Sequence, residues 1–389
     1  MGGRKKRNVK PIFEKTNPKT DATLHQVILP DLKVSQTVKS TGVSSLAQIF
    51  GYQISDYNIP DLWTDTEGEG VLVAVLDTGV QLDHIDLLGS FVKHTNNVSD
   101  GHGHGTHCIG IISANNNDTG IVGIAPKASI LAVKVLADNG SGNDLYTANG
   151  IYEAIERGAD VISMSLGGPY NMPRVHQACK VAYKKGIPII AAAGNSGNTG
   201  MIGYPGNYAE TISIGALDVN KLRAGFSQTG LHLDFMAPGV NILSTVPKNN
   251  YAYMSGTSMA TPWVAGLVAL MIAKHRIHGG STPLNGVEDI RKHLKRTAID
   301  LGDFGRDNRT GWGLIDVKKA IEELGTKKVI IVPPSKPVVI TPIEEPKPVA
   351  KPEPRQIPKP ANQSPQPRQK KKMIIRFLKN QRKRNRKKM

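Results

Sequence analysis

Between residues 51 and 324, short apolar runs alternate with stretches whose apolar side chains fall at helical spacing. The runs are rich in β-branched residues, which is typical of strands buried on both faces of a parallel sheet. The strand-like runs cover residues 71–77, 131–136, 160–166, 187–194 and 211–217, and the clearest helical stretches cover 149–158 and 174–186. This alternation predicts an α/β fold, in which helices cover both faces of a mainly parallel, twisted sheet.

The two ends of the chain lack this pattern. Residues 1–47 are polar, basic and weakly periodic, so we expect a flexible or only locally ordered extension. After a body at 48–325, residues 326–369 are rich in proline, which predicts an extended linker that cannot bury a core. Residues 370–389 form a separate, strongly basic segment. The sequence therefore predicts one folded body with disordered basic tails.

The charge is as unevenly distributed as the hydrophobic pattern. The chain has a formal net charge of +17, to which residues 327–389 contribute +16 and residues 41–326 contribute −5. The basic segment at 370–389 favours a polyanionic partner, either nucleic acid or an anionic membrane. A solvated segment without a specific partner is the alternative. Four apolar residues of this segment lie at the helical spacing that suits membrane insertion, namely Met373, Ile374, Phe377 and Leu378.

The cysteine content and the apolar stretches of the sequence indicate the cellular compartment in which the protein is expected. The two cysteines, Cys108 and Cys179, are too few for a disulfide framework and suit a reducing compartment. No apolar region follows the basic first residues, so no secretory signal is predicted. No apolar stretch reaches the roughly 18 residues that predict a membrane-spanning helix. We therefore expect a cytoplasmic protein, with leaderless export as the alternative, and the sequence leaves the oligomeric state open.

Two motifs contain residues suited to proton transfer. Asp77 ends a strand-like run in AVLDTG, where its carboxylate can fix the tautomer of a histidine; a purely structural aspartate is the alternative. HGHGTHCIG, residues 102–110, has three histidines, and its glycines let one imidazole face a cleft. It contains no HExxH pattern and no Cys/His pair at zinc spacing, so a metal site is not indicated. A surface loop rich in glycine and histidine is the competing interpretation.

Two further motifs are suited to holding an oxyanion. Ser258 lies in GTSMATP, directly before an apolar helical stretch, where main-chain N–H groups and the helix dipole favour negative charge. Such a serine can also be an ordinary helix cap. Asn195 follows a strand-like run in AAAGNSG, and its side-chain amide can donate a second hydrogen bond to an oxyanion.

In their order along the chain, these motifs and several shorter ones resemble those of the subtilisin (subtilase) family. The matching stretches are AVLDTG, HGTH, ISMSLGGP, AAGN, GYPG, APG and GTSMATP, within residues 48–324, and they are closest to the bacterial intracellular subtilisins. The resemblance implies a serine endopeptidase with the triad Asp77, His104 and Ser258, where His104 is the first histidine of HGTH. Asn195 and the Ser258 N–H would hold the oxyanion. A non-catalytic scaffold is the alternative that the complete triad disfavours.

The resemblance also implies a substrate site. Residues 165–167 would pair with an extended substrate main chain, and Gly203 would leave the floor of the S1 pocket open for a large apolar P1 residue. Asp144 at the S4 rim would make basic P4 residues slightly better tolerated. The implied substrate-binding residues are Ser165, Leu166, Gly167, Ala192, Ala193, Gly194, Gly203 and Asp144. We expect broad specificity; a narrower processing role for a protease tethered by its tail is the alternative.

A calcium site is implied as well. NNNDTGI, residues 115–121, resembles the calcium loop of the family, and oxygen donors suit a hard cation. A polar asparagine-rich turn is the alternative. The implied ligands are Asp86, Asn115, Asn117, Thr119 and Ile121, with Gln48 as a further candidate.

Two features depart from the family pattern. The extension at 1–47 is shorter than the folded prodomain of extracellular subtilisins, so it is either an inhibitory propeptide of another kind or only a tail. Cys108 stands where a valine is usual, and we expect a small buried residue whose thiol could confer sensitivity to mercurials.

Overall fold

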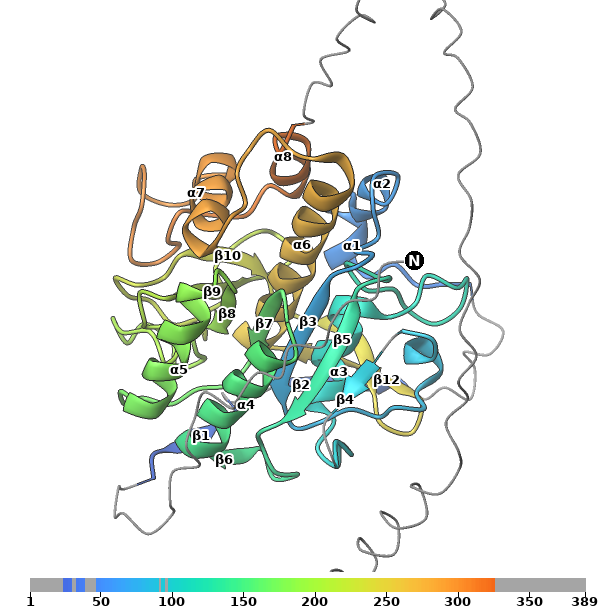
Figure 1. The fold of residues 1–389 in the computed structure, drawn as a ribbon, viewed down its shortest axis with the longest axis horizontal. Coiled ribbons are helices and arrows are strands. Elements are labelled where there is room, and N and C mark those ends of the chain that lie inside the picture. Colours follow the sequence, from blue (N-terminus) through green and yellow to red (C-terminus); the bar gives the residue numbers. More distant parts are fainter. Residues whose placement is uncertain (1–23, 30–32, 39–46, 91, 95–96, 326–389) are drawn as a thin grey trace, which may run out of the picture. The chain divides into compact units, whose positions relative to one another are not determined.

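The computed structural model describes residues 24–29, 33–38, 47–90, 92–94 and 97–325 (Figure 1). The predicted proline-rich linker at 326–369 and the basic segment at 370–389 lie outside the described residues. The same holds for most of the predicted N-terminal extension.

The centre of the fold is a seven-stranded sheet with the strand order β10-β9-β8-β7-β3-β5-β4. All of its neighbouring strands are parallel, and the five runs predicted as strands all belong to it. Its strands are β3 (Leu72–Asp77), β4 (Val92–His94), β5 (Ser129–Lys134), β7 (Val161–Met164), β8 (Ile189–Ala192), β9 (Thr211–Leu217) and β10 (Phe235–Pro238).

Four long helices cover the sheet, α3 (His104–Ser113) and α6 (Thr257–His278) on one face, α4 (Asp144–Glu156) and α5 (Pro173–Lys184) on the other (Figure 1). Strand β3, an interior strand of the sheet, shows why helices must pack against both faces. Val73 and Val75 join a hydrophobic cluster with α3 and α6, whereas Leu72, Ala74 and Leu76 join a second cluster with α4 and α5. Alternate side chains of a strand point to opposite faces, so this confirms the predicted two-sided α/β fold.

Helix α6 passes through the larger cluster and supports the site described below. Its most apolar 18-residue window is 94% buried within the fold, so its length and composition reflect a core helix even though they would also suit a membrane span. Trp263 of α6 is fully buried and donates a hydrogen bond to Gln53 O at 2.8 Å. The other helices are α1 (Tyr52–Ser55), α2 (Ile59–Leu62), the 3₁₀ helix η2 (Ile85–Leu87), α7 (Val287–Thr297) and α8 (Val317–Glu322).

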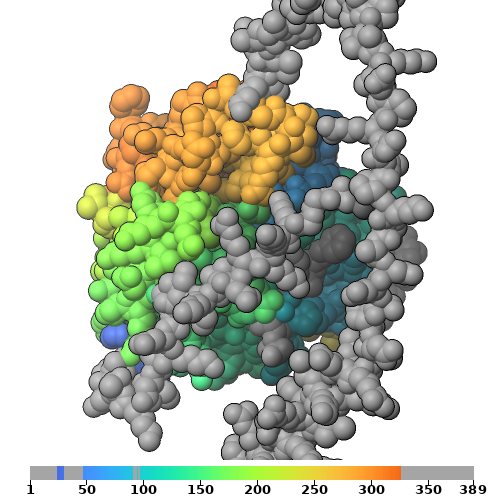
Figure 2. Space-filling model, viewed as in Figure 1, coloured from blue at the N-terminus to red at the C-terminus, as the bar shows by residue number. Residues whose placement is uncertain are grey.

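Two pieces of the extension predicted over 1–47 are strands that pair with the body, so the extension is ordered locally at these places. Strand β1 (Gln26–Ile28) pairs antiparallel with β6 (Ser141–Asn143). Strand β2 (Lys33–Val38) pairs antiparallel with β12 (Asn250–Ser255), which also pairs with β11 (Ile242–Val246). Figure 1 shows β1 beside β6, and blue atoms of the early chain border the green surface in Figure 2. Main-chain pairing with strands of the body holds these segments, so their weak hydrophobic pattern did not reveal them.

Candidate active site

Asp77 and His104 meet at the carboxyl edge of the parallel sheet. Asp77 is the last residue of β3 and His104 is the first residue of α3. His104 Nδ1 lies 2.7 Å from Asp77 Oδ1, and both side chains are buried. Burial of the imidazole lowers its pKa, but the Asp77 carboxylate outweighs this and holds the pKa of His104 well above its usual range. This pairing places the Nδ1 proton toward Asp77 and leaves Nε2 as the basic atom.

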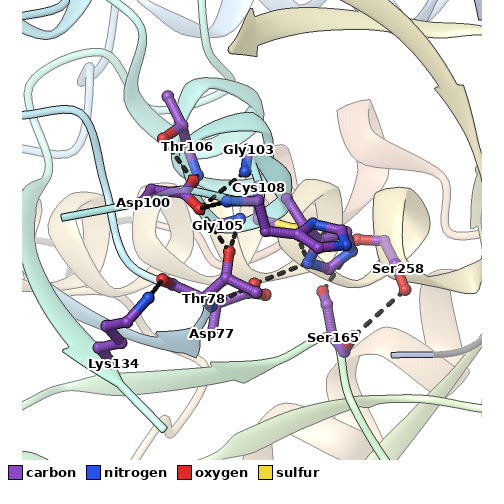
Figure 3. A network of polar contacts seen from close by, with 12 residues as sticks. Asp77, Thr78, Asp100, Gly103, Gly105, Thr106, Cys108, Lys134, Ser165 and Ser258 are labelled. Atoms are coloured by element: carbon purple, nitrogen blue, oxygen red, sulfur yellow. Dashed lines mark hydrogen bonds and ion pairs between the residues drawn. The ribbon is translucent and has the colours of Figure 1, made fainter. Parts of the chain in front are cut away.

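Ser258 is the second residue of α6 and is fully buried. Its hydroxyl donates to Ser165 O at 3.2 Å, and the Ser165 hydroxyl donates to Ser258 O at 2.9 Å (Figure 3). The Cys108 sulfur lies 3.9 Å from both His104 ring nitrogens and 3.5 Å from Ser258 O, so one side chain contacts both residues. In this rotamer the Ser258 hydroxyl points to Ser165 O, and a change of χ1 would be needed to turn it toward the imidazole.

Asn195 follows β8 and is oriented by the residue before Ser258. Its Oδ1 accepts hydrogen bonds from Thr257 N at 2.9 Å and from the Thr257 hydroxyl at 2.8 Å. The Thr257 hydroxyl in turn accepts from Gly194 N at 3.1 Å. These contacts fix the amide so that its nitrogen points away from Thr257, and they place it at the first turn of α6, where N–H groups lack helical partners. The sequence analysis missed Thr257, whose only signal is its position directly before Ser258.

The other two histidines of the HGHGTH motif have different surroundings. His107 is buried with Nε2 3.1 Å from Ile242 O and 3.0 Å from Ala252 O, so it ties α3 to strands β11 and β12. Burial lowers the pKa of His107 to about 3, which keeps it neutral. His102 lies beside His104 with ring centroids 6.3 Å apart, and burial followed by the charge of His104 lowers its pKa. Of these three histidines, His104 is the one that pairs with Asp77.

The predicted substrate-binding segment at 165–167 is paired with the chain's own N-terminal segment. Ile28 N donates to Gly167 O and Gly167 N donates to Ile28 O, both at 3.0 Å. On the other side, Leu29 N donates to Gly140 O at 3.1 Å, next to the pairing of β1 with β6. An extended segment therefore lies between two antiparallel neighbours, with the side chain of Val27 fully buried in the second hydrophobic cluster.

The residues predicted for the S1 pocket follow the carboxyl end of β8 and the adjoining loop. Ala193 is buried and its carbonyl accepts from Gly203 N at 2.9 Å. Gly194 has φ +107, and a side chain there would overlap Gln228 Oε1. A Cβ at Gly203 would instead meet its nearest neighbour, Ala193 O, at 3.5 Å, which is ordinary contact. Ala192 and Leu166 are also buried, and the Leu166 side chain belongs to the second hydrophobic cluster.

Asp144 begins α4, and its side chain is fully buried. Its N–H donates to His25 O at 3.0 Å, which places its main chain beside the N-terminal segment. Its carboxylate pairs with Arg174 at 2.8 Å. This ion pair already balances the charge of Asp144, which weakens the argument for tolerance of basic P4 residues. The P4 preference stays a prediction.

The residues predicted for calcium also come together. The Asp86 carboxylate is fully buried, and its Oδ2 accepts from Ile121 N at 2.8 Å and from the Tyr251 hydroxyl at 2.9 Å. Its Oδ1 has no hydrogen-bond partner among the described residues. Burial raises the pKa of Asp86, although these hydrogen bonds oppose the rise. Gln48 Nε2 donates to Asn115 O at 2.6 Å and to Ile121 O at 3.2 Å.

Two more of the predicted ligands complete this cluster. Asn117 Oδ1 accepts from Thr119 N at 3.2 Å and from the Thr119 hydroxyl at 3.0 Å, so both residues lie in one turn. Carbonyl and carboxylate oxygens that converge around a buried, partly unpartnered carboxylate are the donor set that suits a hard cation. The residues present therefore fit calcium. Tyr251 was not predicted, because its distance from Asp86 in sequence hides the contact.

Comparisons with known proteins agree with this geometry. The model of the Subtilase family matches residues 68–313. Subtilisin DY of Bacillus licheniformis is 42% identical over 283 residues, 69% of this chain and 100% of the relative. Thermitase of Thermoactinomyces vulgaris is 43% identical over 272 residues, 68% of this chain and 92% of the relative. The intracellular serine protease of Paenibacillus polymyxa is 46% identical over 226 residues, 54% of this chain and 69% of the relative.

Proposed function

The chain belongs to the subtilase family and is a subtilisin-type serine endopeptidase, and on that premise we propose that Asp77, His104 and Ser258 are its catalytic triad. The supporting observation is the buried pair of Asp77 Oδ1 and His104 Nδ1 at 2.7 Å. The side chain of Cys108 contacts both the His104 imidazole of this pair and the main chain of Ser258.

In the proposed mechanism, Ser258 Oγ attacks the carbonyl carbon of the scissile peptide bond while His104 Nε2 takes the hydroxyl proton. The imidazolium then passes this proton to the leaving amine, and an acyl-enzyme remains on Ser258. His104 then deprotonates a water molecule, which attacks the ester carbonyl; the acid product leaves, and the imidazolium returns its proton to Ser258 Oγ. Asp77 accepts a hydrogen bond from Nδ1–H and stabilises the imidazolium. The Asn195 amide and the Ser258 N–H stabilise the oxyanion.

We further propose that substrates bind as extended strands along residues 165–167, with broad specificity and a large apolar P1 residue. The pairing of Ile28 with Gly167 supports this, because an extended main chain already uses both hydrogen-bonding groups of Gly167. The absence of a side chain at Gly203, where a Cβ would meet only ordinary contacts, supports the P1 preference. A narrower processing role for a tethered protease is the second candidate.

Cleavage of a peptide library by the purified full chain tests these assignments. We expect cleavage after Phe, Leu and Tyr, no cleavage by Ser258→Ala, and no covalent labelling of that variant by a phosphonate inhibitor. His104→Ala should be nearly as inactive, whereas His102→Ala should retain more activity because His102 does not pair with Asp77. Phosphonate labelling of Ser258→Ala at the wild-type level would refute the nucleophile.

We also propose that calcium binds at Asp86 and the 115–121 turn, where it would stabilise the fold by offsetting the buried carboxylate charge. Ligation would come from Asp86, Asn117, Gln48 and the carbonyls of Asn115, Thr119 and Ile121. When bound, the ion supplies charge balance to the fold and takes no part in peptide hydrolysis.

For the protein's surroundings, we propose a cytoplasmic location and a polyanion-binding role for residues 370–389. The location is supported by the likeness to the intracellular serine protease of Paenibacillus polymyxa, and the role by the basic composition of the segment. Retention of the full chain on DNA or on anionic vesicles, measured against salt and against a chain lacking residues 327–389, tests the second proposal. Equal retention of both chains would refute it.

A further inference from the structure

Another buried carboxylate, that of Asp100, organises the first turn of α3 (Figure 3). Asp100 Oδ2 accepts from Thr106 N at 2.9 Å and from the Thr106 hydroxyl at 2.6 Å. Its Oδ1 accepts from Gly103 N at 2.7 Å and from His102 N at 3.1 Å. Burial raises the pKa of Asp100, but these hydrogen bonds outweigh it and lower the pKa, so the group is ionised at neutral pH. Asp100 therefore holds the main chain on both sides of His104.

Thr78 connects this carboxylate to the other half of the Asp77–His104 pair. The Thr78 hydroxyl donates to Asp100 Oδ1 at 2.8 Å and accepts from Gly105 N, the residue after His104, at 2.9 Å. Thr78 N donates to Asp77 Oδ1 at 2.7 Å, the same oxygen that His104 contacts. The Thr78 carbonyl accepts from Lys134 Nζ. One residue thus touches Asp77, the α3 main chain and Asp100.

Asp77 and His104 come from separate elements, β3 and α3, so their 2.7 Å contact depends on how those two elements are held together. We propose that Thr78 and Asp100 form a positioning pair that sets the alignment of the Asp77 carboxylate with the His104 imidazole during peptide hydrolysis. This inference rests on the proposed triad. Neither residue touches the substrate in this role; both act through the main chain and side chains that they hold.

The hydroxyl of Thr78 allows a sharp test. Thr78→Val keeps the shape but removes the hydroxyl, so Asp100 loses a donor and Gly105 N loses an acceptor, whereas Thr78→Ser keeps both contacts. We expect kcat on a short peptide to fall roughly 10- to 100-fold in Thr78→Val, the cost typical of a misplacement of about 1 Å. KM should change less than about twofold, and Thr78→Ser should have a kcat close to that of the wild type. Rates are normalised to active sites counted with a phosphonate.

Two further readouts separate positioning from simple stability. The pH midpoint of kcat should move to lower pH in Thr78→Val, because a looser contact with Asp77 stabilises the imidazolium less. The low-field proton resonance of His104 Nδ1–H should shift as well. The groups around the imidazole are Asp77, Cys108, His102 and His107, none of which is altered by the substitution.

Thr297→Val is the matched control. Thr297 is also a buried threonine with a hydrogen-bonded hydroxyl, which donates to main-chain carbonyls of His293 and Leu294, but it lies in α7. This variant should lose thermal stability without moving kcat or the pH midpoint. Asp100→Asn should reproduce the fall in kcat, which keeps the inference testable if Thr78→Val folds poorly. Wild-type kcat and pH midpoint in Thr78→Val or Asp100→Asn would overturn the positioning role, whereas activity in Ser258→Ala would instead overturn the triad.

Discussion

Ile28 and Gly167 exchange two main-chain hydrogen bonds of 3.0 Å, and this places the N-terminal segment along the edge that we assign to substrate. The segment and a substrate would need the same two groups of Gly167, so they cannot bind there together. If residues 165–167 bind substrate as we propose, the N-terminal segment competes with substrate. Of the two interpretations that the sequence left open, we therefore propose an inhibitory segment.

The first prediction concerns this competition. Val27→Asp should raise the rate at low substrate concentration, because it places a charge where Val27 is fully buried. Burial of such a side chain is worth about 1.5–3 kcal/mol, so the apparent KM for a short peptide should fall about tenfold or more. Leu24→Asp, at an exposed position just before β1, is the control and should change nothing. An unchanged KM in Val27→Asp would show that the segment does not compete.

The second prediction concerns pH. The neutral form of His104 is the base, and Asp77 raises the pKa of His104, so kcat/KM should increase with pH through a midpoint above about 6.5, the usual histidine value. Asp77→Asn removes the charge, so the midpoint should move to lower pH and kcat should fall on the order of 10⁴-fold, a magnitude measured in serine proteases, subtilisin among them. Asp303→Asn, at an exposed site, should leave the profile unchanged. A midpoint that stays in place in Asp77→Asn would contradict the pairing.

The third prediction concerns calcium. Chelation with EDTA should lower the thermal midpoint, and calcium at about 100 times its Kd should restore roughly 2.7 kcal/mol, or roughly 5–10 °C for a body of this size. Asp86→Ala should blunt this response, because it removes the buried carboxylate. Asp83→Asn is the control, since Asp83 is exposed and bonds Gln81 instead. A wild-type midpoint that EDTA does not change would rule out a stabilising ion.

The fourth prediction concerns the S1 pocket. Gly203→Val should fold normally, since a Cβ there meets only ordinary contacts, and should reduce kcat/KM for Phe relative to Ala at P1 by 10-fold or more, in line with about 1–3 kcal/mol per misfitted group. Gly225→Val is the matched control, because no atom lies within 4 Å of a Cβ at Gly225. Equal P1 profiles for the two variants would place the S1 floor elsewhere.

Much of the fold could be predicted from the sequence, because buried parallel strands have a composition that is easy to recognise. Helix α3 could not, since residues 102–110 contain three glycines and look like a loop. The structure explains the helix by packing: a side chain at Gly105 would overlap Gly79 O, and one at Gly110 would overlap the Thr245 hydroxyl. Close approach to neighbouring segments therefore outweighs the low helix propensity of glycine.

The candidate site divides in the same way. Residues within short motifs, such as Asp77 and Ser258, could be predicted from the sequence, whereas their supports could not. Tyr251 reaches Asp86 across 165 positions, and Thr257 matters only because it orients Asn195. Strand β1 gave no signal, because it has only three residues, of which Val27 alone is buried. Contacts of this kind depend on the folded geometry and leave no local pattern.

If Ser258 on the buried helix α6 is the nucleophile, as we propose, its position has a consequence for the fate of the enzyme in a population of its own copies. A nucleophile on a core helix keeps its position as long as the core remains folded, and core elements are usually the last to unfold. A copy therefore loses its nucleophile only when its core opens, which is also when the rest of its chain becomes digestible. Intact copies can then degrade the unfolded one. Autolysis would therefore remove inactive molecules selectively, and the remaining molecules would all be active.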